Sequence, residues 1–203
     1  MGKADTRRRI VEATVELHED VGPAATTITA IAMRAGVQRL TVYRHFPDDE
    51  ALITACSAHW TERHPAPDPS RWLGIEDPRR RLEEALAAIY AYYRGGARMV
   101  ERVLRDEEEM PELAQVLAPW HEYMREVAGG LAAGWGTDVH RQRTVRAAVG
   151  HALDFFTWRS LAAQGLSDEE AGELMVGLVA EVATGLAYEA AGTKRDPSGE
   201  ASG

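Results

Sequence analysis

The most constraining feature of the sequence is the segment from Thr27 to Phe46, which fits two short helices joined by a tight turn. In its first half, apolar residues recur along one helical face, and Thr27 or Thr29 is placed to cap the first turn. Gly36 then stands where a helix commonly ends in a residue of positive φ. A second short helix is expected over 38–45. Two short helices joined in this way form a helix-turn-helix, whose second helix fits the major groove of DNA.

The residue types in this segment are more specific than its helical pattern. They read IAxxAGVxxxTVYRHF from Ile31 to Phe46, followed by Glu50, Ala51 and Leu52. This sequence resembles the DNA-binding domain of the tetracycline-repressor-type (TetR) family of transcriptional regulators. The resemblance is strong from about Thr6 to Leu52, and the remainder agrees through its length and all-helical pattern. It implies a homodimeric regulator that a small molecule releases from a palindromic operator in double-stranded DNA.

The same resemblance implies roles for side chains of the helix-turn-helix. Side chains at the start of the second helix would face base edges or nearby phosphates, and those further along would contact the DNA backbone. Arginine offers a bidentate fork to guanine, and glutamine can pair with adenine. Taken singly, Tyr43 can also be a half-buried core residue and His45 an ordinary helix end. The residues implied in DNA binding are Thr27, Thr29, Gln38, Arg39, Thr41, Tyr43, Arg44 and His45.

The start of the next helix departs from the family pattern. Family members commonly carry a lysine just before the glutamate of this helix, where it meets phosphate, and here that position is Asp49. Asp48 is a good N-cap and the acidic first turn suits the helix dipole, but an acid near phosphate weakens DNA binding. We expect either that Asp49 points away from DNA or that binding depends more on Arg39, Arg44 and the N-terminal arginines.

The net charge of −9 is unevenly distributed along the chain. Residues 1–47 carry seven Lys or Arg against five Asp or Glu, and residues 48–203 carry 16 basic against 27 acidic groups. Since charge attraction falls off over about 8–10 Å at physiological salt, a basic head on an acidic body is compatible with DNA binding. Arg7, Arg8 and Arg9 open the first helix, expected over 5–21, and can be read as phosphate contacts or as a solvated helix end.

Composition and motifs exclude several other classes. Ala, Leu, Glu and Arg dominate, which favours an all-α fold, and no apolar run reaches the length of about 18 residues that a membrane span needs. The N-terminus lacks the apolar segment of a secretory signal, so a cytoplasmic location is expected. Cys56 is the only cysteine, which rules out an intrachain disulfide and a cysteine-based zinc site. The sequence shows no catalytic or nucleotide-binding fingerprint, so we expect no enzyme, no cofactor and no metal.

The rest of the chain is predicted to be helical throughout. The breaks are a Pro-rich stretch at 64–69, Gly95-Gly96, Pro111 and Gly165, and Ser167 opens a capping box. The expected helices cover 50–63, 77–94, 98–109, 112–133, 139–164 and 168 to about 190. The expected domains are a helix-turn-helix DNA-binding domain (1–47), a connecting helix (48–64), a helical effector-binding and dimerisation domain (65–191) and a disordered tail (192–203).

The body is rich in aromatic and methionine side chains, which either form ordinary core or line a pocket between helices. With the family resemblance, this favours a pocket for an unidentified apolar or aromatic effector. The residues predicted to bind it are Trp60, Tyr90, Tyr93, Met99, Trp120, Tyr123, Met124 and Phe155.

The last two expected helices are apolar around more than one stripe, which is more than a surface helix needs. The resemblance implies that they pair with their mates in a dimeric four-helix bundle. The residues predicted at this interface are His151, Phe155, Trp158, Met175, Leu178, Val182 and Leu186.

Two alternatives remain open from the sequence. One is a helical small-molecule-binding protein with little specific DNA affinity, for which Asp49 is the warning sign. The other is an architectural DNA binder with no effector. The sequence also leaves open the operator bases, the effector, and repression versus activation.

Overall fold

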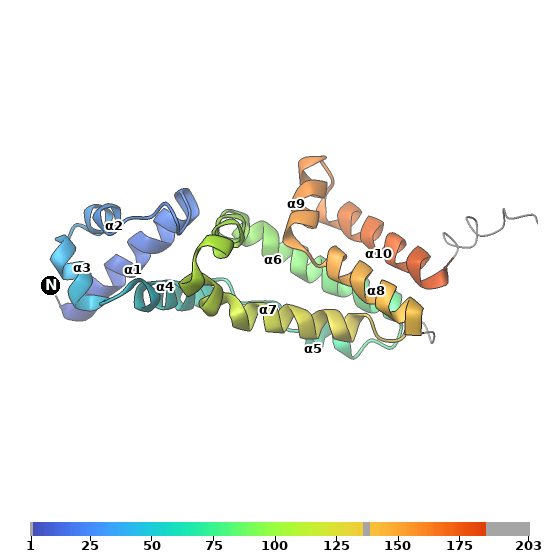
Figure 1. Cartoon of the computed structure of the whole chain (residues 1–203). Helices are drawn as coiled ribbons and strands as arrows, with labels where there is room; N and C mark the ends of the chain where they lie inside the picture. Colours follow the sequence, from blue (N-terminus) through green and yellow to red (C-terminus); the bar gives the residue numbers. More distant parts are fainter. Residues whose placement is uncertain (1, 136–138, 186–203) are drawn as a thin grey trace, which may run out of the picture. The chain divides into compact units, whose positions relative to one another are not determined.

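The computed structural model describes residues 2–135 and 139–185, and within these ranges the protein is all-helical (Figure 1). The helices are α1 (Lys3–Asp20), α2 (Ile28–Ala35), α3 (Arg39–His45), α4 (Asp49–Arg63), α5 (Ser70–Leu73), α6 (Pro78–Asp106), the 3₁₀ turn η1 (Glu107–Glu109), α7 (Pro111–Leu131), α8 (Val139–Ala152), α9 (Phe155–Ala163) and α10 (Asp168–Thr184). The chain forms two compact units, residues 1–68 with 88–126, and residues 69–87 with 127–203.

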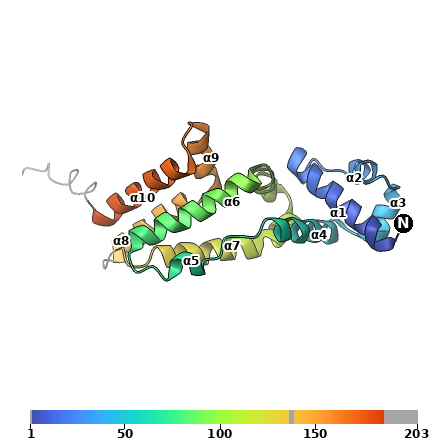
Figure 2. The same cartoon turned by 180° about the vertical axis from the view of Figure 1, so that it is seen from behind.

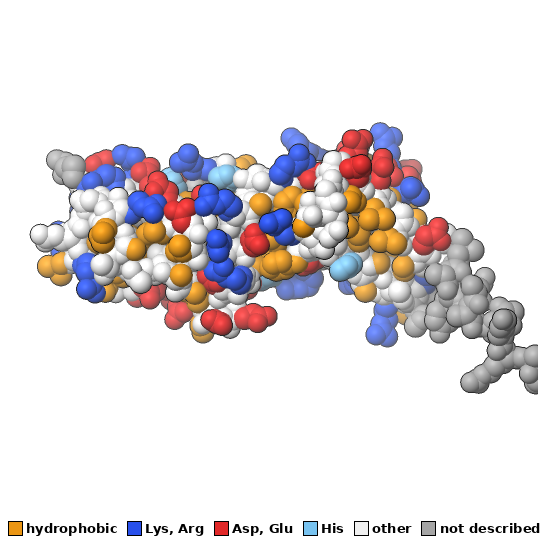
Figure 3. Space-filling view, turned by 90° about the horizontal axis from the view of Figure 1, so that it is seen from above, with side chains coloured by type: hydrophobic (Ala, Val, Ile, Leu, Met, Phe, Trp, Pro, Cys, Tyr) orange, Lys and Arg blue, Asp and Glu red, His pale blue; other side chains and the backbone are white. Residues whose placement is uncertain are grey.

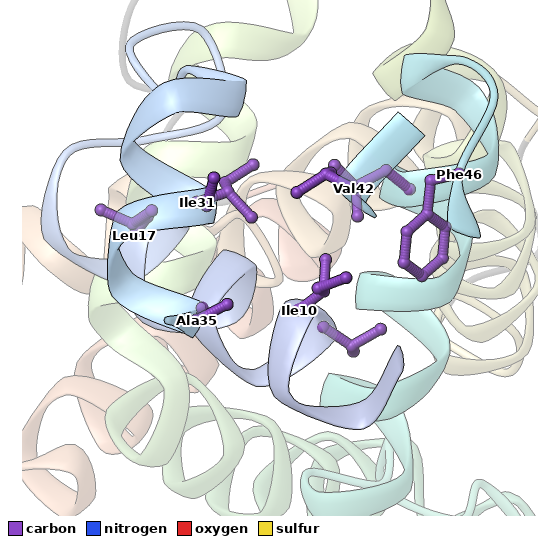
Figure 4. Packing of buried hydrophobic residues seen from close by; sticks show 10 residues of the cluster. Ile10, Leu17, Ile31, Ala35, Val42 and Phe46 are labelled. Atoms are coloured by element: carbon purple, nitrogen blue, oxygen red, sulfur yellow. The ribbon is translucent and has the colours of Figure 1, made fainter. Parts of the chain in front are cut away.

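The N-terminal helices enclose a filled apolar core (Figure 4). α1 packs against α2 and α4, and α2 packs against α3. Ile10 and Val42 are fully buried at its centre, and Phe46 and Leu52 close it from the ends of α3 and α4. Burial of an aliphatic side chain of this kind contributes about 1.5–3 kcal/mol. This core fixes the orientation of α3, whose own seven residues are too few to be helical alone.

The turn between α2 and α3 is set by local chemistry. Thr27 caps α2 by accepting the Ala30 N–H, and Gly36 ends it with φ of +65°. The Val37 N–H bonds back to the Ala32 carbonyl, which satisfies one of the last acceptors of the helix. The helix-turn-helix predicted from the sequence is therefore present, with its expected cap and its expected glycine.

The expected stop at Gly95-Gly96 is wrong, because α6 continues through both glycines to Asp106 (Figure 2). Gly96 is buried against Trp60 of α4, and a Cβ at this position would lie 2.7 Å from the Trp60 ring. Gly96 is therefore a site of close packing between two helices. Apolar side chains before and after it keep the helix in place, which outweighs the low helix propensity of glycine.

The expected long helix over 139–164 is also wrong, since it is divided into α8 and α9 at Leu153-Asp154. Asp154 adopts an extended conformation and its side chain accepts the Thr157 N–H, so it acts as the N-cap of a new helix. The capping box at Ser167 is present as predicted, and α10 ends at Gly185. The expected continuation of this helix to residue 190 lies outside the described residues.

The contiguous domain ranges stay a prediction, since the compact units are built from separate stretches of chain. The first unit joins α1 to α4 with residues 88–106 of α6 and most of α7. The second joins α5 and the start of α6 with α8, α9 and α10, which pack on one another. Within the described residues, no helix is long and apolar enough to cross a membrane, and no group of three or more His, Cys, Asp or Glu gathers as a metal site.

Candidate functional site

The recognition helix α3 presents most of its predicted DNA-binding side chains to solvent. Gln38, Arg39 and Arg44 are exposed, and Tyr43 is 45% exposed. Thr41 is half-buried and accepts a hydrogen bond from Arg44 at 3.3 Å. These groups offer the donors and acceptors that base edges and phosphates require.

Basic groups gather around the C-terminal end of α3. The pKa of His45 is lowered, first by desolvation and then by the positive charges of Lys3, Arg44 and Arg7. Arg7 lies over the Phe46 ring, with its guanidinium carbon 4.9 Å from the ring centre. α1 and α3 thus share a patch of positive potential, which is what a phosphate backbone requires.

Other N-terminal arginines have structural partners instead. Arg8 pairs with Asp5 at 2.7 Å and with Glu12 at 3.0 Å, and Arg34 pairs with Glu16 at 3.1 Å. Arg9 donates to the Ala35 carbonyl at 2.9 Å, at the end of α2. Of the three arginines that open α1, the structure therefore gives Arg8 and Arg9 intramolecular roles.

Two exposed apolar residues of the helix-turn-helix are not among the predicted DNA-binding residues. Leu40 on α3 is 67% exposed and Met33 on α2 is 78% exposed. An apolar side chain on a recognition helix can contact the methyl group of thymine. A search for polar contacts alone overlooks this kind of base readout.

The first unit also contains a pocket of about 790 Å³, walled by α4, α6 and α7. Its lining is mostly apolar, with Val100, Val103 and Leu104 from α6 and Leu113, Val116 and Leu117 from α7. Cavities of this size hold drug-sized molecules.

Aromatic rings form a continuous row along the pocket. Trp60 meets Tyr92 edge-on at 6.1 Å, Tyr92 stacks on Trp120 at 5.4 Å, and Trp120 stacks on Tyr123 at 5.4 Å, all between ring centres. The Tyr123 hydroxyl donates to the Pro67 carbonyl, which ties the segment after α4 to α7. Burial raises the pKa of Tyr92 to about 12, so this phenol is neutral at physiological pH.

The lining includes half of the residues predicted to bind the effector. Trp60, Met99, Trp120 and Tyr123 are in it, whereas Tyr90, Tyr93, Met124 and Phe155 are not. Tyr90, Tyr93 and Phe155 are core residues, at most 2% exposed. Tyr92 and the apolar residues of α6 and α7 were missed, because helical spacing alone does not distinguish a residue that faces a cavity from one that faces a filled core.

Two buried side chains that can titrate, His18 of α1 and Cys56 of α4, are part of the pocket lining. The Cys56 Sγ lies 3.6 Å from the His18 Nδ1. Burial lowers the pKa of His18 to about 4, although Asp106 opposes the shift, and burial raises the pKa of the Cys56 thiol to about 12. Both side chains are therefore neutral at physiological pH, and Cys56 has none of the thiolate character of a reactive cysteine.

The end of α6 is joined to the loop that follows α1. Asp106 is buried, accepts the Ala24 N–H at 3.0 Å and pairs with Arg105 at 2.7 Å. Arg105 also donates to the Val21 carbonyl at 3.2 Å. We call this set of contacts the α6 latch. It connects a pocket helix directly to the helices that carry the recognition helix.

In the second unit, the predicted dimer residues divide between core and surface. Phe155, Trp158 and Met175 are buried within their own chain, so they cannot form an exposed face. Leu178 is 50% exposed, His151 is exposed and Val182 is half-buried, whereas Leu186 lies outside the described residues. On α9 and α10, the exposed large apolar residues are Phe156, Leu174 and Leu178, at 48%, 43% and 50% exposure. Hydrophobic side chains gather over this α9 and α10 region in Figure 3.

Comparison with known proteins agrees with this geometry. The model of the bacterial regulatory proteins of the tetR family matches residues 10–56. The chain is 30% identical over 162 residues to the HTH-type transcriptional repressor Rv3405c of Mycobacterium tuberculosis, covering 79% of this chain and 76% of that protein.

Two solved structures share its fold. A TetR-like transcriptional regulator from Rhodococcus sp. RHA1 superposes with a TM-score of 0.64 at 19% identity, over 89% of this chain and 96% of that one. AibR, solved in complex with isovaleryl coenzyme A and operator DNA, gives a TM-score of 0.62 at 21% identity, over 85% of this chain and 97% of that one.

Proposed function

Because the chain belongs to the TetR family, and is a DNA-binding transcriptional regulator rather than an enzyme, we propose that it is a homodimeric repressor released from its operator by a small molecule. Repression is proposed because the relative Rv3405c is a transcriptional repressor. The effector is proposed to bind in the pocket of the first unit, and the operator to be a palindrome read by two copies of α3.

The observation that carries this proposal is the double role of α4. Leu52, in its second turn, is part of the apolar core that fixes α3, whereas Cys56 and Trp60, further along, line the pocket. A ligand that pushes on the pocket side of α4 therefore acts on a helix that also supports the recognition helix. Such a ligand changes DNA affinity only by binding one position of α4 better than the other.

The α6 latch supplies a second connection in the same unit. Met99 and Leu104 line the pocket, and Arg105 and Asp106 follow them directly at the end of α6. A displacement of α6 by ligand is passed to the backbone of Val21 and Ala24. Two helices of the pocket wall, α4 and α6, thus contact the DNA-binding helices through separate sets of residues.

A second copy of the chain is the proposed occupant of the apolar surface on α9 and α10. Phe156, Leu174 and Leu178 form an exposed apolar group on these two helices. Two-fold pairing through such a surface gives the two recognition helices the symmetry of a palindromic site. Sedimentation of the full chain tests this, because a monomer at micromolar concentration would contradict it.

The function is tested by binding of the purified protein to DNA upstream of its own gene, measured by fluorescence anisotropy over a range of salt concentrations. We expect tight binding to an inverted repeat, with affinity falling steeply as salt rises. The variant Arg39→Ala with Tyr43→Ala should lose this binding and keep its helical content. The matched control is Arg79→Ala, an exposed arginine at the start of α6 in the second unit.

An inverted repeat selected from random DNA extends the test if the upstream DNA gives no specific complex. Absence of any site bound more tightly than random DNA would exclude operator recognition by this protein. Effectors are then sought by their ability to raise the dissociation constant of the complex.

A further inference from the structure

The charge of the pocket lining is one-sided. Among the described residues that line it, none is a lysine or an arginine, and Glu50 is the only acid. His18 is the one further titratable base in the lining, and its burial keeps it neutral. An anionic ligand, such as the coenzyme A thioester bound by AibR, would find no positive side chain in this wall.

The aromatic row of the pocket favours a positively charged ligand. Successive ring centres in the row Trp60, Tyr92, Trp120 and Tyr123 lie 5.4 to 6.1 Å apart. The face of an aromatic ring carries negative potential and attracts an organic cation within about 6 Å. Indole and phenol rings without a neighbouring ammonium or guanidinium in the lining are therefore suited to a positive ligand.

A backbone group strengthens this preference. Pro119 lies inside α7 and has no N–H, so the carbonyl of Gln115 cannot accept the usual helical bond from residue 119. Gln115 and Pro119 both line the pocket, next to Trp120. This segment of α7 thus has a carbonyl that lacks its usual donor, and a free carbonyl dipole favours a positive charge nearby.

The acids around the pocket act in the same direction. Acids lie near three titratable groups of the wall: Asp106, which pairs with Arg105, near His18, Glu19 near Cys56 and Asp68 near Tyr123. Each of these groups belongs to the first unit, as does the whole lining. Acidic side chains thus lie near the wall on α1, after α4 and at the end of α6.

We propose that the effector pocket selects hydrophobic organic cations, with the positive centre held against the Tyr92, Trp120 and Tyr123 rings and the apolar part against α6 and α7. The inference rests on the proposed function and specifies its ligand class. Glu50, at the edge of the lining, contributes the formal counter-charge.

The test compares two probes of the same shape and opposite charge, tetraphenylphosphonium and tetraphenylborate. Each is titrated into the full-length protein by calorimetry, with quenching of tryptophan fluorescence as the second readout. We expect the phosphonium to bind at least tenfold more tightly than the borate. Equal affinities, a tighter borate, or binding of neither probe would each overturn the proposal.

Variants locate the site. Trp120→Leu keeps an apolar side chain and removes the ring, and we expect it to weaken phosphonium binding at least fivefold. Glu50→Gln should weaken it about two- to fivefold, whereas Glu62→Gln, on the same helix but outside the lining, should leave it unchanged. An unchanged affinity in Trp120→Leu would contradict binding at this pocket.

The operator assay on the same preparations separates the two levels of inference. If specific DNA binding is intact and the phosphonium fails to bind, the regulator stands and the ligand class is wrong. If DNA binding is also absent, the proposed function itself fails.

Discussion

The first unit contains two regions of opposite character that share one helix. Around Ile10 and Val42 the side chains fill the space between α1, α2, α3 and α4, whereas α4, α6 and α7 enclose a pocket of about 790 Å³. A filled core changes shape with difficulty, because any shift opens cavities or creates overlaps. A hollow region can be repacked around a ligand. This difference indicates that the pocket region changes shape when a ligand binds. The filled N-terminal core then transmits that change as a rigid body.

The largest expected effect comes from opening a cavity in the filled region. Ile10→Ala should lower the free energy of unfolding by about 2–5 kcal/mol, because Ile10 is fully buried among well-packed neighbours. Urea denaturation measures this. Val100→Ala, which removes methyl groups from the half-buried pocket wall, is the matched change and should destabilise by less than half as much. Equal losses would show that the pocket wall is packed as tightly as the core.

A second prediction concerns pH at the boundary between the two regions. His18 is buried with its pKa lowered to about 4, below the ordinary histidine value of 6.5, so the unfolded chain binds the proton more readily. Stability contributed by neutral His18 is present above pH 6.5 and is lost as pH falls toward 4, by about 3 kcal/mol. His18→Gln should flatten this part of the stability curve. Thermal unfolding at a series of pH values checks it, and an unchanged slope in the variant would contradict it.

A third prediction separates stability from communication. Asp106→Asn removes the charge that pairs with Arg105, and we expect a loss of about 1–3 kcal/mol in the free energy of unfolding. It should also reduce the factor by which a pocket ligand weakens operator binding, since the α6 latch is loosened. Glu108→Gln, in the adjoining turn and exposed, is the control. An unaltered ligand effect would mean that α4 alone carries the response.

The smallest expected change in stability is at Leu40. Leu40→Ala should alter the free energy of unfolding by less than about 0.5 kcal/mol, because the side chain is on the surface. It should nevertheless reduce discrimination at one thymine of the operator by about 1 kcal/mol or more. Binding to operators with single-base changes measures this. Preserved preference at every position would exclude Leu40 from base readout.

Features set by neighbouring residues were predictable from the sequence. Thr27 caps α2, Gly36 ends it, Asp48 caps α4 and Ser167 opens a capping box, because each of these depends on groups within a few residues. The exposed face of α3 follows from the same short-range periodicity. The resemblance of this segment to one family then supplied the fold of the rest.

Features set by distant residues were not predictable in the same way. The Gly95-Gly96 pair was expected to end a helix, but α6 continues through it and Gly96 packs against Trp60, which is distant in sequence. The break at Asp154 begins a new helix, α9, in which Phe155 is buried and Phe156 is exposed. Tyr92 and Tyr93 are consecutive, yet only Tyr92 lines the pocket. Helical periodicity predicts where the helices are, but it does not predict which residues each helix face contacts.

Asp49, in the acidic first turn of α4, bears on the balance between DNA-bound and released protein in a regulator of the proposed kind. If the Asp49 carboxylate lies near a DNA phosphate, it shortens the residence time on DNA and brings the bound and released populations closer together. Each tenfold reduction in operator affinity lowers by about 1.4 kcal/mol the preference that a ligand must show for the released form. Such a regulator responds to effectors that show only a small preference for the released form. Its repression in the absence of effector is correspondingly incomplete.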